Sequence, residues 1–380
     1  MKARLILADG TIFEGSAIGA QGRTIGETVF TTGMTGYIET LTDPSYYGQI
    51  VTQTFPLVGN YGVMPQDFES KKSWVRGYIV RDLCGQPSNF RCQGTLDAFL
   101  KSQGIVGICG IDTRALTKKL RESGVMNGMI ISGNADENRA DAALLEEIRA
   151  YKITDAVKSV QNAGILGAKS SGDAGAFTPE SDSPRVVLWD FGAKANIQRE
   201  LEKRGCQVAV LPFGAAADEI LSLNPSGIML SNGPGDPAEN VGVIQELKKI
   251  CEWNKEAASP IPIFGICLGH QMLALARGAN TSKLKYGHRG ANHPCKDLST
   301  GRVYITSQNH GYAVLADSLP PFARLSFVNV NDNTCEGVEY SDIPAFSVQF
   351  HPEACGGPHD TNFLFDRFIK MMEETKPLCR

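Results

Sequence analysis

The chain has 380 residues, of which 42% are hydrophobic and 21% are charged, and its formal net charge at pH 7 is −4. This composition is typical of a soluble globular protein, and the length predicts two or three domains. A slightly acidic chain offers no broad basic surface, so nucleic acid is not an expected partner.

Two further features indicate the compartment. The only apolar stretch near the N-terminus, residues 5–8, is too short for a signal peptide, and no run approaches the roughly 20 apolar residues of a membrane span. The 10 cysteines show no CxxC pair or regular spacing, which favours reduced thiols over a disulfide framework. We therefore expect a cytoplasmic protein that is not held in a membrane.

Residues 1–150 are predicted to form a smaller domain of mixed, β-rich structure. Short segments of alternating polarity are punctuated by Gly, Asp and Pro, as in strands and turns. Asp112 or Thr113 would cap a helix that ends at Gly124. In chain order we expect strands and turns over 3–19 and 26–56, a helix over 95–104, a strand over 105–112, a helix over 112–124 and a strand over 125–133.

Residues 151–184 are predicted to connect two domains. The stretch 137–158 has helical character, but residues 159–183 are rich in Gly, Ala and Ser and show no periodicity. The segment GILGAKS, 164–170, nearly matches a phosphate-binding loop. Its lysine does not directly follow the glycine and no strand leads into it, so we expect no nucleotide site there.

Residues 185–380 are predicted to form an α/β domain. Short apolar runs alternate with amphipathic segments, which predicts βαβ units and a buried parallel sheet flanked by helices. The expected strands are 185–192, 207–213, 227–232 and 261–269, and the expected helices are 193–205, 216–224, 239–254 and 270–278. Shorter strands within 302–314, 323–330 and 336–353 and a helix over 362–374 complete the domain.

The strand 261–269 ends in the sequence GICLG, with Cys267 at its centre, and turns at once into a helix. Such a corner is the thiol form of a nucleophile elbow, in which a strained central residue stands at the edge of the sheet. The helix dipole lowers the pKa of a thiol there, and the N–H of Leu268 points to where an oxyanion would form. The alternative is that Cys267 is a buried core thiol beside packing glycines.

Two other strand ends carry polar groups toward the same edge of the sheet. Pro352 ends one strand, so His351 could take the thiol proton while Glu353 orients the imidazole. The loop SNGPGDP, 231–237, ends another strand, and the N–H of Gly233 could be a second oxyanion donor. Each feature alone could be an ordinary turn, but together they predict a cysteine nucleophile with its base.

These motifs resemble those of known families. In the order and spacing of SNGPGDP, GICLGHQ and FHPE, residues 185–380 are similar to the class I (triad) glutamine amidotransferase domain, which has a flavodoxin-like parallel sheet flanked by helices. The earlier stretches TGMTGYIETLTDPSYYGQ and GICGIDTRALTKKLRESG resemble the leading domain of the carbamoyl phosphate synthase small-chain family. The resemblance covers nearly the whole chain apart from the connector.

The resemblance implies the glutaminase subunit of glutamine-hydrolysing carbamoyl-phosphate synthase. Such a subunit converts L-glutamine to glutamate and ammonia through a cysteine thioester and channels the ammonia to a large chain. The large chain uses ATP, Mg and bicarbonate to make carbamoyl phosphate for pyrimidine or arginine biosynthesis. No cofactor or metal is expected in this chain, which would form a heterodimer with the large chain and, from there, a higher-order oligomer of heterodimers.

The resemblance also implies roles for individual residues. The triad matches Cys267, His351 and Glu353, and the positions that contact glutamine match Ser45, Gly233, Gly235, Leu268, Gln271, Asn309, Gly311 and Tyr312. At the last of these positions many relatives carry Phe, and an added hydroxyl should be tolerated if that edge is wet.

Two other functions remain open at this point. One is a different cysteine amidase or peptidase on the same fold, and the other is a catalytically idle subunit that only stabilises the large chain. A metal site at His288, His293 and Cys295 is disfavoured, because their spacing matches no zinc pattern and the family has a loop there near the glutaminase site.

Overall fold

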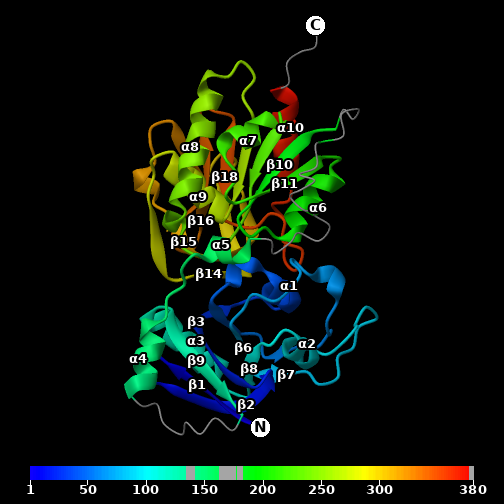
Figure 1. The fold of residues 1–380 in the computed structure, drawn as a ribbon, viewed down its shortest axis with the longest axis vertical. Coiled ribbons are helices and arrows are strands. Elements are labelled where there is room, and N and C mark those ends of the chain that lie inside the picture. Colours follow the sequence, from blue (N-terminus) through cyan, green and yellow to red (C-terminus); the bar gives the residue numbers. More distant parts are fainter. Residues whose placement is uncertain (134–141, 162–176, 178–182, 376–380) are drawn as a thin grey trace. The chain divides into compact units, whose positions relative to one another are not determined.

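The computed structural model describes residues 1–133, 142–161, 177 and 183–375 (Figure 1). It divides into two compact units, one of Met1–Ala156 with His288–Gly290 and the other of Val157–Gly287 with Ala291–Arg380. The segment 164–170, which resembles a phosphate-binding loop, lies outside the described residues, as does most of the predicted connector. No helix among the described residues has the length and apolar character needed to cross a membrane.

The first unit is a closed β-barrel, which confirms the predicted β-rich domain. The pairs β3–β4, β4–β6 and β6–β8 are parallel, and the pairs β8–β2, β2–β1, β1–β9 and β9–β3 are antiparallel. Closure leaves the barrel without a free edge that could pair with another chain. Around the barrel the strands are β1 (Lys2–Leu7), β2 (Ile12–Gly19), β8 (Val106–Cys109), β6 (Gly77–Ile79), β4 (Gln49–Gln53), β3 (Gly22–Thr31) and β9 (Met126–Ser132).

Short elements surround this barrel. The helices predicted over 95–104 and 112–124 are both present, and in the second the Asp112 side chain accepts the Ala115 N–H at 2.9 Å as the expected N-cap. The helical character expected within 137–158 appears as two helices, 142–150 and 156–160, which Asp155 separates with a positive φ of 49°; residues 137–141 lie outside the described part of the chain. The elements are α1 (Tyr37–Thr42), β5 (Leu57–Val58), β7 (Asp82–Leu83), α2 (Leu96–Ser102), α3 (Thr113–Ser123) and α4 (Ala142–Ala150). Helix α5 (Ala156–Val160) begins at the boundary between the units, and Val157 belongs to the core of the second unit.

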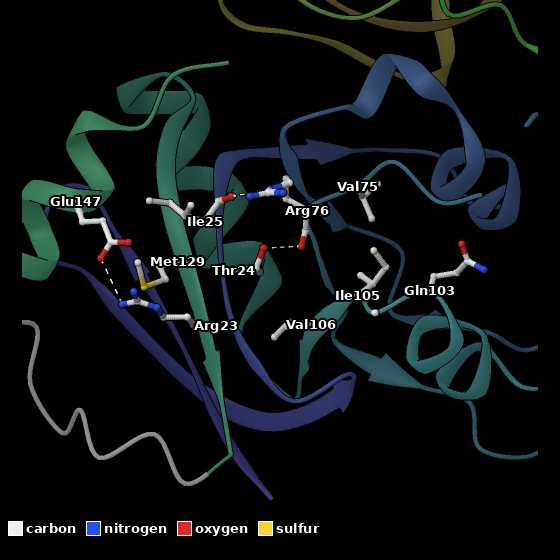
Figure 2. Close-up of a pocket in the computed structure, with 11 residues that line it drawn as sticks. Arg23, Thr24, Ile25, Val75, Arg76, Gln103, Ile105, Val106, Met129 and Glu147 are labelled. Atoms are coloured by element: carbon white, nitrogen blue, oxygen red, sulfur yellow. Dashed lines mark hydrogen bonds and ion pairs between the residues drawn. The ribbon is translucent and has the colours of Figure 1, made fainter. Parts of the chain in front are cut away.

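A hollow of about 410 Å³ lies at the end of the barrel where β3, β6 and β8 begin (Figure 2). In Figure 2 the Arg23 guanidinium extends toward Glu147, and the two groups pair at 3.4 Å. Thr24 Oγ1 donates a hydrogen bond to the Arg76 carbonyl at 2.7 Å. The lining residues are Arg23, Thr24, Ile25, Val75, Arg76, Gln103, Gly104, Ile105, Val106, Met129 and Glu147.

The second unit is built on a nine-stranded sheet. The first five strands of the sheet are parallel, and the pairs β18–β17, β17–β16 and β16–β14 are antiparallel. The predicted α/β class is therefore confirmed, and antiparallel strands extend the parallel part of the sheet. In order across the sheet the strands are β11 (Gln207–Pro212), β10 (Arg185–Asp190), β12 (Gly227–Leu230), β13 (Ile263–Ile266), β18 (Ala345–Val348), β17 (Cys335–Tyr340), β16 (Ala323–Asn329), β14 (Thr281–Asp297) and β15 (Val303–Val314).

Helices cover both faces of the parallel strands (Figure 1). Side chains of β10 alternate between two cores, with Val187 and Trp189 in one and Val186 and Leu188 in the other. The first core also holds α7, α8 and α9, and the second holds α6 and α10. These helices are α6 (Ala195–Lys203), α7 (Ala217–Ser222), α8 (Val241–Glu256), α9 (Leu268–Ala276) and α10 (Phe363–Glu374).

The loop expected around His288, His293 and Cys295 is wrong, because these residues belong to the 17-residue strand β14. The sequence conceals this strand because its side chains are largely polar and it contains two glycines, which are typical of turns. Burial raises the pKa of the Cys295 thiol, which contacts Thr306 Oγ1 at 3.4 Å and Gln308 Nε2 at 3.3 Å. A thiol held protonated in this way is a poor metal ligand.

Candidate active site

The carboxyl ends of four parallel strands, β10, β12, β13 and β18, meet at one edge of the second unit's sheet. The paired register places Leu230 beside Gly265 and Ile266 beside Val348, so the segments that follow these strands are neighbours. Ligands of open α/β sheets bind at such an edge. This edge is therefore where the predicted site residues of the second unit should meet.

Cys267 occupies the corner between β13 and α9 with φ 52° and ψ −103°. A non-glycine residue at positive φ is strained, and the strained conformation expected from the GICLG sequence is thus observed. The Cys267 N–H donates to the Val348 carbonyl at 2.9 Å, which anchors the corner to the neighbouring strand. A Cβ on Gly269 would overlap the Leu230 carbonyl, so the turn requires a glycine after the cysteine.

The loop 231–237 packs directly on this corner. A Cβ on Gly233 would lie 2.7 Å from Leu268 Cδ2 and closer still to the Phe191 carbonyl oxygen. In the described part of the chain, neither the Gly233 N–H nor the Leu268 N–H has a hydrogen-bond acceptor. Backbone N–H groups without an acceptor, on segments that pack together at a thiol, are the kind of donor that stabilises an oxyanion.

His351 and Glu353 follow β18 and are both about 1% exposed. His351 Nδ1–H donates to Glu353 Oε1 at 2.7 Å, which fixes the ring so that Nε2 carries the acid–base chemistry. Nε2 has no hydrogen-bond partner among the described residues. The hydrogen bond to Glu353 therefore holds the imidazole in one orientation.

Lys194 is a member of this site that the sequence analysis missed. Its buried Nζ lies 3.1 Å from Glu353 Oε1 and 3.1 Å from His351 Nδ1. Because Nδ1 already donates its proton to the carboxylate, the ammonium acts on the imidazole through its charge rather than as a hydrogen-bond donor. A sequence signal existed, since Lys194 follows the end of strand β10 at the same sheet edge.

The three charges set one another's protonation. Burial raises the pKa of Glu353, but the Lys194 ammonium and His351 lower it by more, so that the pKa falls to about 2. Burial and Lys194 lower the pKa of His351, whereas Glu353 and Cys267 raise it, and the balance raises it to about 9. At neutral pH the site therefore holds a carboxylate and an imidazolium, which can deliver a proton to a leaving group.

Two contacts connect the predicted glutamine contacts of the second unit to Cys267 and to the helix that follows it. Cys267 Sγ is 3.7 Å from the Asn309 carbonyl oxygen on β15, two residues before Gly311. One turn along α9, Gln271 Nε2 donates to the Tyr312 carbonyl at 2.8 Å. Gly235 lies in the loop after β12 with φ 89°, a conformation that favours glycine.

Ser45 belongs to the first unit, in a 3-10 helix of Pro44–Tyr46 capped by Asp43. The roles of Ser45 and of the other predicted contacts in binding glutamine stay predictions.

Two family models match the chain. "Carbamoyl-phosphate synthase small chain, CPSase domain" matches residues 5–130 and "Glutamine amidotransferase class-I" matches residues 187–371. Relatives named carbamoyl phosphate synthase small chain include that of Symbiobacterium thermophilum, 48% identical over 97% of this chain and 98% of the relative. That of Listeria monocytogenes is 50% identical over 98% of this chain and 97% of the relative. That of Fusobacterium nucleatum is 50% identical over 97% of this chain and 98% of the relative.

Proposed function

We propose that Cys267, His351 and Glu353 of this chain hydrolyse glutamine. The chain belongs to the carbamoyl phosphate synthase small-chain family, whose members are the glutamine-hydrolysing subunits of that enzyme. The observation that carries the proposal is the strained Cys267 at the start of α9, beside the buried His351–Glu353 pair. The two segments follow neighbouring parallel strands, β13 and β18, so the fold itself brings thiol and imidazole to one edge.

The chemistry is acyl transfer in two steps. The Cys267 thiolate attacks the γ-amide carbon of glutamine, and the N–H groups of Gly233 and Leu268 stabilise the oxyanion, at about 3 kcal/mol for each donor. The C–N bond then breaks as the His351 imidazolium gives its proton to the departing ammonia, which leaves a γ-glutamyl thioester. Neutral His351 next takes a proton from water, whose oxygen attacks the thioester and releases glutamate and the thiolate.

The substrate contacts are part of the same proposal. Gln271, Asn309, Gly311 and Tyr312 would contact glutamine, which the Cys267 contact with the Asn309 carbonyl and the Gln271 contact with the Tyr312 carbonyl support. Gly235 keeps the loop after β12 in shape, and Ser45 would complete the site from the first unit.

Ammonia made here requires a consumer, and a separate large chain is proposed to be that partner. This large chain would use ATP, Mg and bicarbonate to form carbamoyl phosphate in the cytoplasm, for pyrimidine or arginine biosynthesis. The first unit would dock on it, and ammonia would pass to it through a channel. The small chain would need no cofactor or metal of its own, and the heterodimer would be the unit of any larger oligomer.

The substitution Cys267→Ser in the complex with the large chain tests this assignment. Glutamine-dependent carbamoyl phosphate synthesis should fall at least about 10⁴-fold, because serine is not ionised at neutral pH, while synthesis from added ammonium persists. Loss of both activities would contradict the division of labour. An electrophilic glutamine analogue should label Cys267 in the wild type, and failure to label it would favour a catalytically idle subunit instead.

A further inference from the structure

The amide of Gln271 is held by two acceptors. Its Nε2 donates to the Tyr312 carbonyl at 2.8 Å and to Gln349 Oε1 at 2.9 Å. A primary amide has two N–H groups, so both are taken. The Gln271 side chain is almost completely buried, and its Oε1 has no hydrogen-bond partner among the described residues.

The orientation of this amide follows from its partners. A backbone carbonyl can only accept, so the Tyr312 contact requires Nε2, and not Oε1, on that side. The same carbonyl lies 2.7 Å from His310 Nδ1, which holds it in place. The second Gln271 N–H then requires an acceptor from Gln349, which fixes the orientation of that amide as well.

Gln349 has no other evident task in its position. It is fully buried just after β18, two residues before His351, and its own Nε2 has no acceptor among the described residues. A buried N–H without an acceptor costs stability, so an apolar residue of the same size would serve packing better. The contact with Gln271 is the interaction that the amide supplies.

Gln271 lies one helical turn beyond the nucleophile. Gln271 follows Cys267 by four residues, so it stands on the same face of α9 about 6 Å further along the helix axis. In glutamine the γ, β and α carbons separate the amide carbon from the α-ammonium group. A substrate whose amide carbon meets the sulfur can therefore place its ammonium near Gln271.

We propose that Gln349 is a positioning residue that locks the Gln271 amide, so that its oxygen alone faces the substrate and accepts the α-ammonium group. The proposal rests on glutamine hydrolysis at Cys267 and adds a reason for amino-acid specificity. A fixed acceptor favours a substrate with an ammonium group over an otherwise identical amide that lacks one.

The test compares L-glutamine with glutaramate, which keeps the amide and carboxylate but lacks the α-amino group. Ammonia release is measured with the full chain in complex with its large chain. The wild type should prefer glutamine by about 10²-fold or more in kcat/KM. Gln349→Met should reduce this preference about tenfold by raising KM for glutamine, with kcat and the activity on glutaramate within about twofold of wild type.

Two further variants separate positioning from general damage. Gln349→Glu keeps an acceptor oxygen of similar reach and should retain the preference within about threefold, even if Gln349→Met does not fold. Ser347→Ala removes the buried 2.8 Å contact between Ser347 Oγ and His270 Nδ1 near the same strand end, and should leave the preference unchanged.

The outcomes are distinguishable. A wild-type preference in Gln349→Met, or an equal loss in Ser347→Ala, would overturn the role of Gln349 while leaving glutamine hydrolysis intact. A tenfold loss in Gln349→Glu would also overturn it. A wild-type complex that releases no ammonia from glutamine would instead contradict the proposed function itself.

Discussion

Both units pair a basic side chain with a glutamate, but in opposite surroundings. In the first unit, Arg23 and Glu147 meet at the rim of the barrel hollow with side chains 54% and 46% exposed (Figure 2). In the second, Lys194 and Glu353 meet at 3.1 Å with side chains 9% and 0% exposed. Water screens the first pair and is excluded from the second.

The difference shows that pairing alone does not mark a functional site. An exposed pair exchanges one solvated state for another and contributes little to the free energy of unfolding. A buried pair has lost its hydration, so each charge depends on its neighbours, and those neighbours can hold His351 and Glu353 in the protonation states that catalysis needs.

The largest expected effect is a loss of stability when the buried pair is broken, and breaking the exposed pair is its control. Lys194→Met leaves the Glu353 carboxylate buried with less compensation, which should lower the free energy of unfolding by about 3–5 kcal/mol. The matched control, Arg23→Met, should change it by no more than about 1 kcal/mol. Urea denaturation of the full chain measures both, and similar losses in the two variants would refute the contrast.

A smaller loss is expected at the oxyanion site. Gly233→Ala introduces a Cβ that collides with Phe191 and Leu268, so the loop must move and its N–H should miss the oxyanion. The loss of one donor should lower kcat for glutamine about 10²–10³-fold without lowering ammonium-dependent synthesis. In the first unit, Gly85→Ala meets no atom within 4 Å and should leave both rates unchanged. Equal effects of the two substitutions would contradict this account.

The pH dependence should reveal the buried charges. The pKa of His351 is raised from 6.5 to about 9, so the stability from its imidazolium is complete below pH 6.5 and is lost as the pH rises through 9. Above pH 9 His351 no longer carries the proton for ammonia, and kcat/KM for glutamine should fall about tenfold per pH unit.

Lys194 provides the control for that profile. Its ammonium lowers the pKa of His351, so Lys194→Met should move the alkaline limb to higher pH, whereas Arg23→Met should leave it in place. Profiles of kcat/KM from pH 6 to about 10.5 measure the alkaline limb of each variant. An alkaline limb that stays at the wild-type pH in Lys194→Met would refute the coupling between Lys194 and His351.

The smallest effect is expected for Tyr312→Phe. Tyr312 acts through its backbone carbonyl, which accepts from Gln271 and contacts His310, and the half-buried ring keeps its shape without the hydroxyl. The KM for glutamine should stay within about twofold of wild type. A tenfold rise in steady-state assays would show that the hydroxyl contacts the substrate.

Much of the second unit could be predicted from the sequence because its signals are local. Apolar strands alternate with amphipathic helices. The GICLG corner holds the strained Cys267 and the two glycines that permit its conformation within five consecutive residues. The barrel of the first unit could be predicted only as β-rich, because its closure depends on the pairing of β1 with both β2 and β9, far apart in the chain.

The sequence by itself determined the α/β class, the strand-end placement of Cys267, His351 and Glu353, and the glycines at the corner, since each depends on neighbours in the chain. Only the tertiary structure decided that Lys194 joins the triad and that Gln349 holds Gln271. Those contacts join residues 157 to 159 and 78 positions apart, and burial at the meeting of strand ends, rather than any local pattern, gives them their strength.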